Sequence, residues 1–456
     1  MRAQLVRTAV LEIYEQVRRE GARADQALQR VLRREKQLRS VERRAVSDAV
    51  YGLLRLQGRV DHLLGKALGT RGSALEKLAT PTQHLLRYAA FLVIGDKHGF
   101  ESAAGMAGPE VAPYAWVLEL VARPDGLAAP SDPVDALAAE TSLPRWLAEL
   151  WSGQLGPAET KALAAALNQR APLTIRTNVL KGTREALEAA LAAEGAKVAR
   201  TKFSDLGLSF TSRTNVFALK SFKAGLFEVQ DEGSQLIAEA VRARPGQIIV
   251  DACAGAGGKT LALAGSMNNT GKLVACDRDG RRLLELKLRA RRASVHNYEM
   301  RSVAEGPAGE ERIKDLIGAA DAVLIDAPCS GLGALRRNPD ARWRLDLDEV
   351  RSFPPRQSQI LDRYSKLVKP GGLLLYATCS INREENEDVR AAFLAGHPEF
   401  GPVSPAELLG AERAAALAAA GSGPGLPALG AREHDVQLAP ERHGTDGFYI
   451  AGLRRR

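Results

Sequence analysis

Hydrophobic residues recur every three or four positions in the first part of the chain, as in Leu5, Ala9, Ile13 and Val17. This spacing is typical of amphipathic helices, and no strand-like alternation competes with it. A stretch rich in Pro, Gly, Ala and Asp interrupts the pattern at residues 123–133, as expected for a linker. We therefore predict an all-helical domain over residues 1–140.

A short region of mixed pattern comes next. Residues 173–178, 208–211 and 216–219 have strand-like patterns, and residues 183–194 have a helical one. We therefore expect a small α+β domain over residues 141–235, placed before the main sheet as a platform for substrate.

From residue 247 onward, apolar strand-like runs alternate with helical patterns. This alternation is typical of βαβ units and predicts a mostly parallel sheet with helices on both faces. The strand-like runs lie at 248–250, 273–276, 322–325 and 373–376, with a closing strand at 447–450. We expect a Rossmann-like domain over residues 236–456, and the fold class is multidomain α plus α/β.

Composition narrows the class of protein. The chain has 456 residues and a formal net charge of +9, and its first sixty residues contain fourteen Lys or Arg against seven Asp or Glu. This surplus favours a polyanionic partner, although a charged outer face on a helical bundle would look the same. The N-terminus lacks the apolar core of a signal peptide and no apolar run is long enough to span a membrane, so we expect a soluble, cytoplasmic protein.

The four cysteines do not indicate a metal site. They form no CxxC pair and have no His partners at zinc spacing, so we predict no bound metal. Cys253 and Cys276 follow apolar runs, and we interpret both as small buried apolar side chains.

A glycine-rich loop at residues 251–260 follows the first strand of the main sheet and begins a helix. Its amides and the helix N-terminus suit a bound ligand. A phosphate-binding P-loop would need glycine where Cys253 stands, and a dinucleotide fingerprint would need glycine at Thr260. Asp277 ends the next strand, where a carboxylate holds ribose hydroxyls. This combination fits S-adenosylmethionine, and the alternative is a tight strand-to-helix connection without a ligand.

Cys329 and Cys379 each stand directly after a strand-like run of the predicted sheet. Ligands of open parallel sheets bind beyond the carboxyl ends of the strands, so both thiols would face one crevice. Two thiols at a ligand site favour covalent catalysis.

The motifs around these cysteines are specific. They comprise Asp326-Ala327-Pro328-Cys329-Ser330, Arg336-Arg337-Asn338-Pro339-Asp340 with Trp343, and Thr378-Cys379-Ser380 followed by Glu385-Asn386-Glu387. With Arg176-Thr177-Asn178 and Gly257-Gly258-Lys259-Thr260 upstream, residues 142–455 resemble the Nop/Sun family of RNA 5-methylcytosine methyltransferases. The helical region is similar to the NusB-like domain that bacterial Sun members of this family carry.

The resemblance implies methyl transfer from S-adenosylmethionine to carbon 5 of a cytidine in RNA. It implies that Cys379 is the nucleophile, that Cys329 assists product release, that Asp326 hydrogen-bonds the target base and that Lys259 helps to hold Asp326 or the substrate. In DNA cytosine methyltransferases the Pro-Cys cysteine is the nucleophile, so exchanged roles for Cys329 and Cys379 remain an alternative.

The cofactor would lie against the loop and the acids of the neighbouring strands. We expect it to contact Cys253, Ala254, Gly255, Ala256, Gly257, Gly258, Lys259, Asp277, Glu305 and Asp326. Two positions depart from the family pattern: Gly255-Ala256 replaces Ala-Pro, which makes the loop less rigid, and the acid expected after the third strand has only Glu305 as a candidate.

The resemblance implies small-subunit ribosomal RNA as the substrate, with transfer RNA as the nearest rival. A target base must be unpaired or flipped, and aromatic or Arg planes can stack on it, so the candidate RNA-binding residues are Arg176, Asn178, Arg336, Arg337 and Trp343. A non-catalytic RNA-binding or assembly factor is a rival of another class, which the intact cysteine pair disfavours. We expect a monomer.

Overall fold

The computed structural model describes residues 2–127, 129–422 and 429–456. The chain forms two compact units: Met1–Arg170 with Leu335–Leu347, and Ala171–Ala334 with Asp348–Arg456. The first unit therefore extends past the predicted boundary at residue 140, and it also takes in a segment that lies far along the chain.

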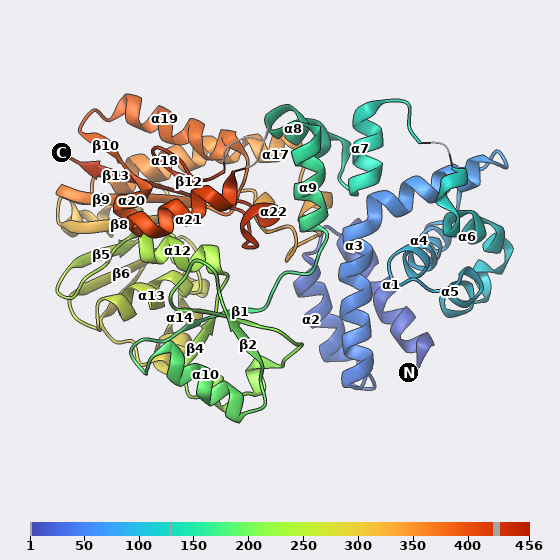
Figure 1. Ribbon diagram of the computed structural model, residues 1–456, viewed down its shortest axis with the longest axis horizontal. Coiled ribbons are helices and arrows are strands. Elements are labelled where there is room, and N and C mark those ends of the chain that lie inside the picture. Colours follow the sequence, from blue (N-terminus) through green and yellow to red (C-terminus); the bar gives the residue numbers. More distant parts are fainter. Residues whose placement is uncertain (1, 128, 423–428) are drawn as a thin grey trace. The chain divides into compact units, whose positions relative to one another are not determined.

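The first unit is built of helices throughout residues 2–127 and 129–170, shown in blue to teal in Figure 1. Ala9, Ile13 and Val17, expected on an apolar helical face, are buried, as are Leu53 and Leu54 of the long helix α3. The helices are α1 Ala3–Arg19, α2 Ala24–Arg34, α3 Ser40–Gly69, α4 Thr80–Ile94, α5 Phe100–Ala107, α6 Ala115–Ala122, α7 Pro133–Thr141, α8 Arg145–Leu155 and α9 Pro157–Leu167, with 3₁₀ turns η1 Leu75–Lys77, η2 Pro109–Tyr114 and η3 Pro124–Gly126.

Some arginines of this basic region stabilise the helices themselves. The Arg43 guanidinium donates hydrogen bonds to the carbonyl oxygens of Leu32, Glu35 and Leu38, at 2.6–3.1 Å. These carbonyls belong to the last turn of α2 and the connection that follows, where backbone oxygens lack helical partners. Part of the positive charge that pointed to a polyanion is therefore used in folding.

Residues 335–347 pack into the helical unit. Trp343 packs against the helical core and its Nε1 donates to the Leu54 carbonyl oxygen at 2.6 Å. Arg342, in the short helix α16 (Ala341–Arg344), is fully buried and donates to Asn168 Oδ1 at 2.7 Å. Burying these side chains removes apolar surface from water, which holds the segment in this unit.

The second unit contains a small antiparallel sheet with strand order β2-β3-β1-β4, covered by helix α10 (Arg184–Ala193). The strands are β1 Thr174–Thr177, β2 Val198–Arg200, β3 Gly207–Phe210 and β4 Phe227–Val229. The strand predicted at residues 216–219 is wrong. Residues Val216–Ala218 form a 3₁₀ turn, η4, and the short helix α11 (Lys220–Lys223) follows, because Val216 and Phe222 pack beneath the sheet rather than within it.

The large sheet has strand order β11-β12-β13-β9-β8-β5-β6-β7, and β10 pairs with β13. Neighbours from β9 to β7 are parallel, whereas β13 is antiparallel to β9. The strands are β5 Ile248–Asp251, β6 Lys272–Asp277, β7 Tyr298–Ser302, β8 Ala320–Asp326, β9 Val368–Thr378, β10 Phe400–Val403, β11 Gly430–Ala431, β12 Val436–Leu438 and β13 Phe448–Arg455.

Both faces of this sheet are buried, because alternate residues of its strands point to two separate apolar layers. One layer joins the sheet to helices that include α12 (Glu232–Ala240), α13 (Gly258–Ser266), α14 (Gly280–Ala293) and α21 (Ala411–Gly421). The other joins it to α18 (Phe353–Ser365) and α19 (Glu387–Gly396), seen in Figure 1 as separate orange helices. This explains why the strands read as continuous apolar runs.

The strand order places the site. It runs β9-β8-β5 in one direction from β5 and β6-β7 in the other, so β5 lies at a topological switch point. Ligands of such sheets bind beyond the carboxyl ends of the strands at this point. The glycine loop after β5, Asp277 at the end of β6, Asp326 at the end of β8 and Thr378 at the end of β9 therefore share one edge.

Candidate active site

The two cysteines after β8 and β9 lie in direct contact. The Sγ atoms of Cys329 and Cys379 are 3.1 Å apart, and the backbone amide of Cys379 donates to the Cys329 Sγ at 3.3 Å. Both side chains are only partly buried and both thiols are free. Adjacent parallel strands end at the same edge, so residues fifty positions apart in sequence present two thiols to one place.

The two thiols differ in their surroundings. The hydrogen bond to Cys379, burial and the negative charge of Glu385 all raise the pKa of the Cys329 thiol well above its usual range. Cys329 therefore keeps its proton in the resting pair. A thiol that holds its proton is a poor nucleophile and a proton donor.

Lys259 and Asp326 form an ion pair beside the cysteines. Lys259 lies in the first turn of α13 and its Nζ is 2.6 Å from Asp326 Oδ2. Burial lowers the pKa of Lys259, but the charge and the hydrogen bond of Asp326 outweigh it, so the pKa is raised overall. The Asp326 side chain remains 30% exposed, which leaves carboxylate surface for a ligand.

The glycine loop has a backbone that side chains would disturb. Gly255 and Gly257 both have positive φ, at 54° and 83°, a region that favours glycine. A Cβ at Gly257 would lie 2.2 Å from Cδ1 of Leu286 on α14, so this residue also allows α13 and α14 to approach. Gly257 is the N-cap of α13, and the amides of Ala254, Gly255 and Gly257 donate within the fold, to the carbonyl oxygen of Cys276, to Asp277 Oδ2 and to the carbonyl oxygen of Ala254.

Asp277 supports the same loop from β6. Its Oδ2 accepts the Gly255 amide at 2.8 Å and its Oδ1 accepts the Asp279 amide at 2.8 Å. These bonds hold the carboxylate at the carboxyl edge of the sheet, next to the glycine turn, where the sequence predicted an acid for ribose hydroxyls. Each oxygen keeps a further lone pair for a ligand.

Asp251 is a site residue for which the sequence predicted no role. It ends β5, is fully buried, and its Oδ2 accepts the Thr260 hydroxyl at 2.7 Å. Its Oδ1 has no hydrogen-bond partner among the described residues. Burial raises the pKa of Asp251 to about 7, against the opposing effect of the Thr260 bond. In the sequence, the position of Asp251 at the end of a strand-like run and directly before the glycine loop was the feature that pointed to a role in the site.

Arg176 and Asn178, expected to face RNA, are buried. Arg176 Nη1 donates to the Gly258 carbonyl oxygen at 2.9 Å and also hydrogen-bonds Gln230. Asn178 Nδ2 donates to the carbonyl oxygens of Gly225 and Ala293, at 2.8 and 2.9 Å. These side chains connect the small sheet to the glycine loop and to α14, and their role in RNA binding stays a prediction.

The other expected RNA-side residues belong to the helical unit. Arg336 is buried, and Trp343 uses its indole N–H on Leu54; Arg337 is half-buried. In this structure Arg336 and Trp343 pack within that unit.

Glu305, Cys276 and Cys253 differ in how far they are exposed. The Glu305 side chain is 79% exposed and pairs with Arg278 at 2.8 Å, so binding a cofactor there requires breaking this ion pair. Cys276 is fully buried, which confirms the expectation for it. Cys253 in the glycine loop is only partly buried, because the loop lies at the edge of the sheet.

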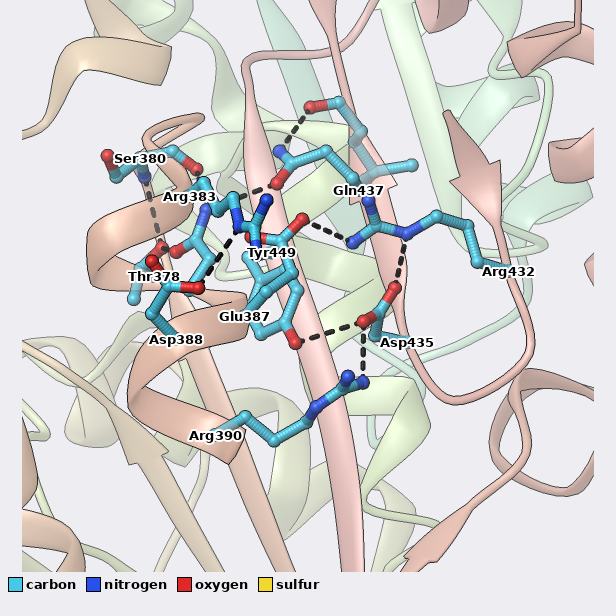
Figure 2. A network of polar contacts seen from close by, with 12 residues as sticks. Thr378, Ser380, Arg383, Glu387, Asp388, Arg390, Arg432, Asp435, Gln437 and Tyr449 are labelled. Carbon is cyan, nitrogen blue, oxygen red and sulfur yellow. Dashed lines mark hydrogen bonds and ion pairs between the residues drawn. The ribbon is translucent and has the colours of Figure 1, made fainter. Parts of the chain in front are cut away.

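Polar contacts support the turn that carries Cys379. Figure 2 shows Thr378, Ser380 and Gln437 in this network. Thr378 Oγ1 donates to Asn386 Oδ1 at 2.6 Å, and Asn386 Nδ2 donates to the Ser380 carbonyl and to Gln437 Oε1, at 3.0 and 3.1 Å. The turn after β9 is thereby fixed to β12 across the start of α19.

The described part of the chain contains no cluster of three His, Cys, Asp or Glu residues able to hold a metal ion. None of its described helices is long and apolar enough to cross a membrane.

Two family models match this chain. The model described as 16S rRNA methyltransferase RsmB/F matches residues 238–454, and the ferredoxin-like domain of RsmF/B-like methyltransferases matches residues 143–217. The chain is 31% identical to ribosomal RNA small subunit methyltransferase B of Thermus thermophilus, covering 100% of this chain and 99% of that protein. It is 29% identical to a probable ribosomal RNA small subunit methyltransferase B of Synechocystis, over 97% and 98% of the two chains.

Solved structures show the same architecture. The crystal structure of PH0851 has a TM-score of 0.75 at 27% identity, covering 98% of this chain and 99% of that chain. A methyltransferase homologue from Pyrococcus horikoshii has a TM-score of 0.58 at 26% identity, covering 72% of this chain and 100% of that one.

Proposed function

Because the chain belongs to the RsmB/F family of 16S rRNA methyltransferases, we propose that it methylates carbon 5 of a cytidine in small-subunit ribosomal RNA. The observation that carries the proposal is the contact between Cys329 and Cys379, 3.1 Å apart, at the sheet edge that also holds Asp326, Lys259 and the glycine loop. The methyl donor of this family is S-adenosylmethionine, which when bound supplies an electrophilic methyl group on its sulfonium sulfur.

The residues present fit this donor. The buried Asp251 Oδ1 lacks a partner among the described residues, and a ligand ammonium group would satisfy it. Asp277 retains lone pairs for ribose hydroxyls. These two features match the amino-acid and ribose parts of the molecule.

The cysteines supply the covalent chemistry. Carbon 5 of cytosine is a poor nucleophile, so a thiolate must first add to carbon 6 and make carbon 5 electron-rich. We assign this addition to Cys379. Cys329, which lies next to the same base, donates its proton to the Cys379 sulfur as the Cys379–carbon 6 bond breaks, and the resulting Cys329 thiolate takes the proton that leaves carbon 5.

Asp326 activates the base. Its carboxylate, held by Lys259 at 2.6 Å, hydrogen-bonds the ring and favours the protonated form, which withdraws electrons from carbon 6. Lys259 holds this carboxylate in position.

The proposed activity is tested by transferring labelled methyl groups to RNA from cells that lack this protein. We expect label at a cytidine of small-subunit ribosomal RNA, and the mapped site should be unmethylated before the reaction. Label in transfer RNA alone would show that the substrate assignment is wrong. No label in any RNA would show that the protein is not an RNA methyltransferase.

Asp326→Asn should lower the rate of methyl transfer by about 10²-fold, since the amide cannot stabilise the protonated ring. The measurement is single-turnover methyl transfer with saturating RNA. Asp321→Asn is the matched control, because Asp321 stands near the start of β8, at the opposite edge, and pairs with Lys369. Equal rates for both variants would remove Asp326 from the mechanism.

A further inference from the structure

The two cysteine turns share one buried acid. Each cysteine is followed by a serine, Ser330 after Cys329 and Ser380 after Cys379. Both serine hydroxyls donate to the same oxygen, Glu385 Oε1, at 2.5 Å from Ser330 and 2.6 Å from Ser380. A single carboxylate oxygen therefore ties together the turns at the ends of β8 and β9.

The second oxygen of Glu385 strengthens the hold on the Cys329 turn. Glu385 Oε2 accepts the Ser330 amide at 2.8 Å and Gln357 Nε2 at 3.2 Å. Gln357, on α18, also donates to the Pro328 carbonyl oxygen at 3.1 Å. Cys329 is thereby held from the residue before it and from the residue after it.

Glu385 itself is fixed in place. It ends the 3₁₀ turn η7 (Arg383–Glu385) and its carbonyl oxygen accepts the Tyr376 hydroxyl at 2.6 Å. The next residue, Asn386, bonds the Ser380 carbonyl. Consecutive residues of one short segment therefore bind both the side chain and the backbone of the Cys379 turn.

The four donors to the carboxylate are hydroxyl, amide and backbone groups, all of them neutral, and Glu385 is fully buried. Burying a carboxylate is costly unless hydrogen bonds replace its water. Here they do, and the negative charge stays close to the thiols without a cation among those donors. A negative charge in a buried site opposes the formation of a thiolate nearby.

We propose that Glu385 is a positioning residue with two effects: it holds the Cys329 and Cys379 turns at their contact distance, and it places a buried negative charge beside the Cys329 turn. This inference extends the proposed function, and the expected effect of Glu385 on catalysis rests on that function. The effects of Glu385 on the two thiols can be measured without RNA.

Two substitutions separate the two effects. In Glu385→Gln, the amide oxygen can still accept from Ser330 N and Gln357, and the amide N–H₂ can donate to the serine hydroxyls, which rotate to accept. This variant removes the charge and keeps the connection. Glu385→Ala removes both. Glu387→Gln is the matched control, because Glu387 lies two residues away and pairs with Arg432.

The charge is tested by the pH dependence of iodoacetamide alkylation, followed at each cysteine by mass spectrometry. In Glu385→Gln we expect the Cys329 profile to move to lower pH and its alkylation at pH 8 to rise at least about threefold. Glu387→Gln should match the wild type. An unchanged Cys329 profile in Glu385→Gln would overturn the charge effect.

The positioning is tested with diamide, which takes two electrons and two protons from a pair of thiols and leaves a disulfide. The wild type and Glu385→Gln should form the Cys329–Cys379 disulfide at rates within about threefold, and Glu385→Ala at least about tenfold more slowly. The double variant Ser330→Ala/Ser380→Ala provides the same test if Glu385→Ala does not fold. Wild-type rates in both would overturn the positioning role.

We call the hydrogen bonds between Glu385 and the two cysteine turns the Glu385 clamp. With RNA as substrate, losing the charge of this clamp should lower the turnover rate. We expect Glu385→Gln to lower kcat at least about tenfold with KM for RNA within about twofold, since the step that needs the Cys329 proton is affected and binding is not. If the thiol experiments succeed and no RNA is methylated even by the wild type, the clamp stands and the proposed function fails. A changed KM with an unchanged kcat would overturn the claim that Glu385 affects the catalytic step.

Discussion

Cys379→Ala should abolish methyl transfer, with a loss of at least about 10⁴-fold in single-turnover rate. Without the thiolate there is no addition at carbon 6, and carbon 5 stays too electron-poor to accept a methyl group. The measurement is transfer of labelled methyl groups to small-subunit ribosomal RNA by purified variant protein, with folding checked by thermal unfolding.

Cys276→Ala is the matched control for this loss. Cys276 is also a strand cysteine of the same sheet, but it is fully buried and faces the apolar layer under α18. Its replacement should cost about 1 kcal/mol of stability and leave the methyl transfer rate within about threefold. Activity retained by Cys379→Ala would exclude it as the nucleophile.

Cys329→Ala should accumulate a covalent protein–RNA adduct. Addition and methyl transfer depend on Cys379 and proceed, but elimination is slow because the group that assists it is gone. The adduct is detected as a complex of protein and labelled RNA that survives denaturing electrophoresis, and it should require the methyl donor.

The double variant Cys329→Ala/Cys379→Ala identifies the attacking sulfur, because it should form no adduct. An adduct that appears in Cys379→Ala instead of Cys329→Ala would show that the two cysteines exchange roles. The contact of 3.1 Å between the sulfurs makes both assignments geometrically possible. The resemblance to the family favours Cys379 as the nucleophile, and the raised pKa of the Cys329 thiol agrees with it.

Two of the residues expected to bind RNA, Arg336 and Trp343, pack within the helical unit. Arg336 and Trp343 looked suited to RNA because they are basic or aromatic and follow the Cys329 motif. The structure uses them to anchor residues 335–347 within the helical unit. A composition that suits nucleic acid also suits packing against carbonyl oxygens and apolar helices, so residue type alone did not separate these roles.

The sequence alone predicted the helical N-terminal region, because apolar residues recur there with the helical period of 3.6 residues. It also predicted the parallel sheet, because its strands are short continuous apolar runs. Both patterns come directly from local geometry. It also predicted the cysteine pair, the glycine loop and Asp277, since strand ends of a parallel sheet share an edge whatever the loops do. Here the motif residues and the topology point to the same place.

Only the tertiary structure decided which polar residues work on the site and which hold the chain together. Arg176 and Asn178 are buried under the glycine loop and α14, one Asp251 oxygen has no partner among the described residues, and Glu385 joins two serines fifty residues apart. Hydrogen bonds between distant residues depend on how elements pack, and a buried charge is tolerated only where such bonds surround it. These contacts leave no period or spacing in the sequence, so the three-dimensional arrangement of the chain was needed to reveal them.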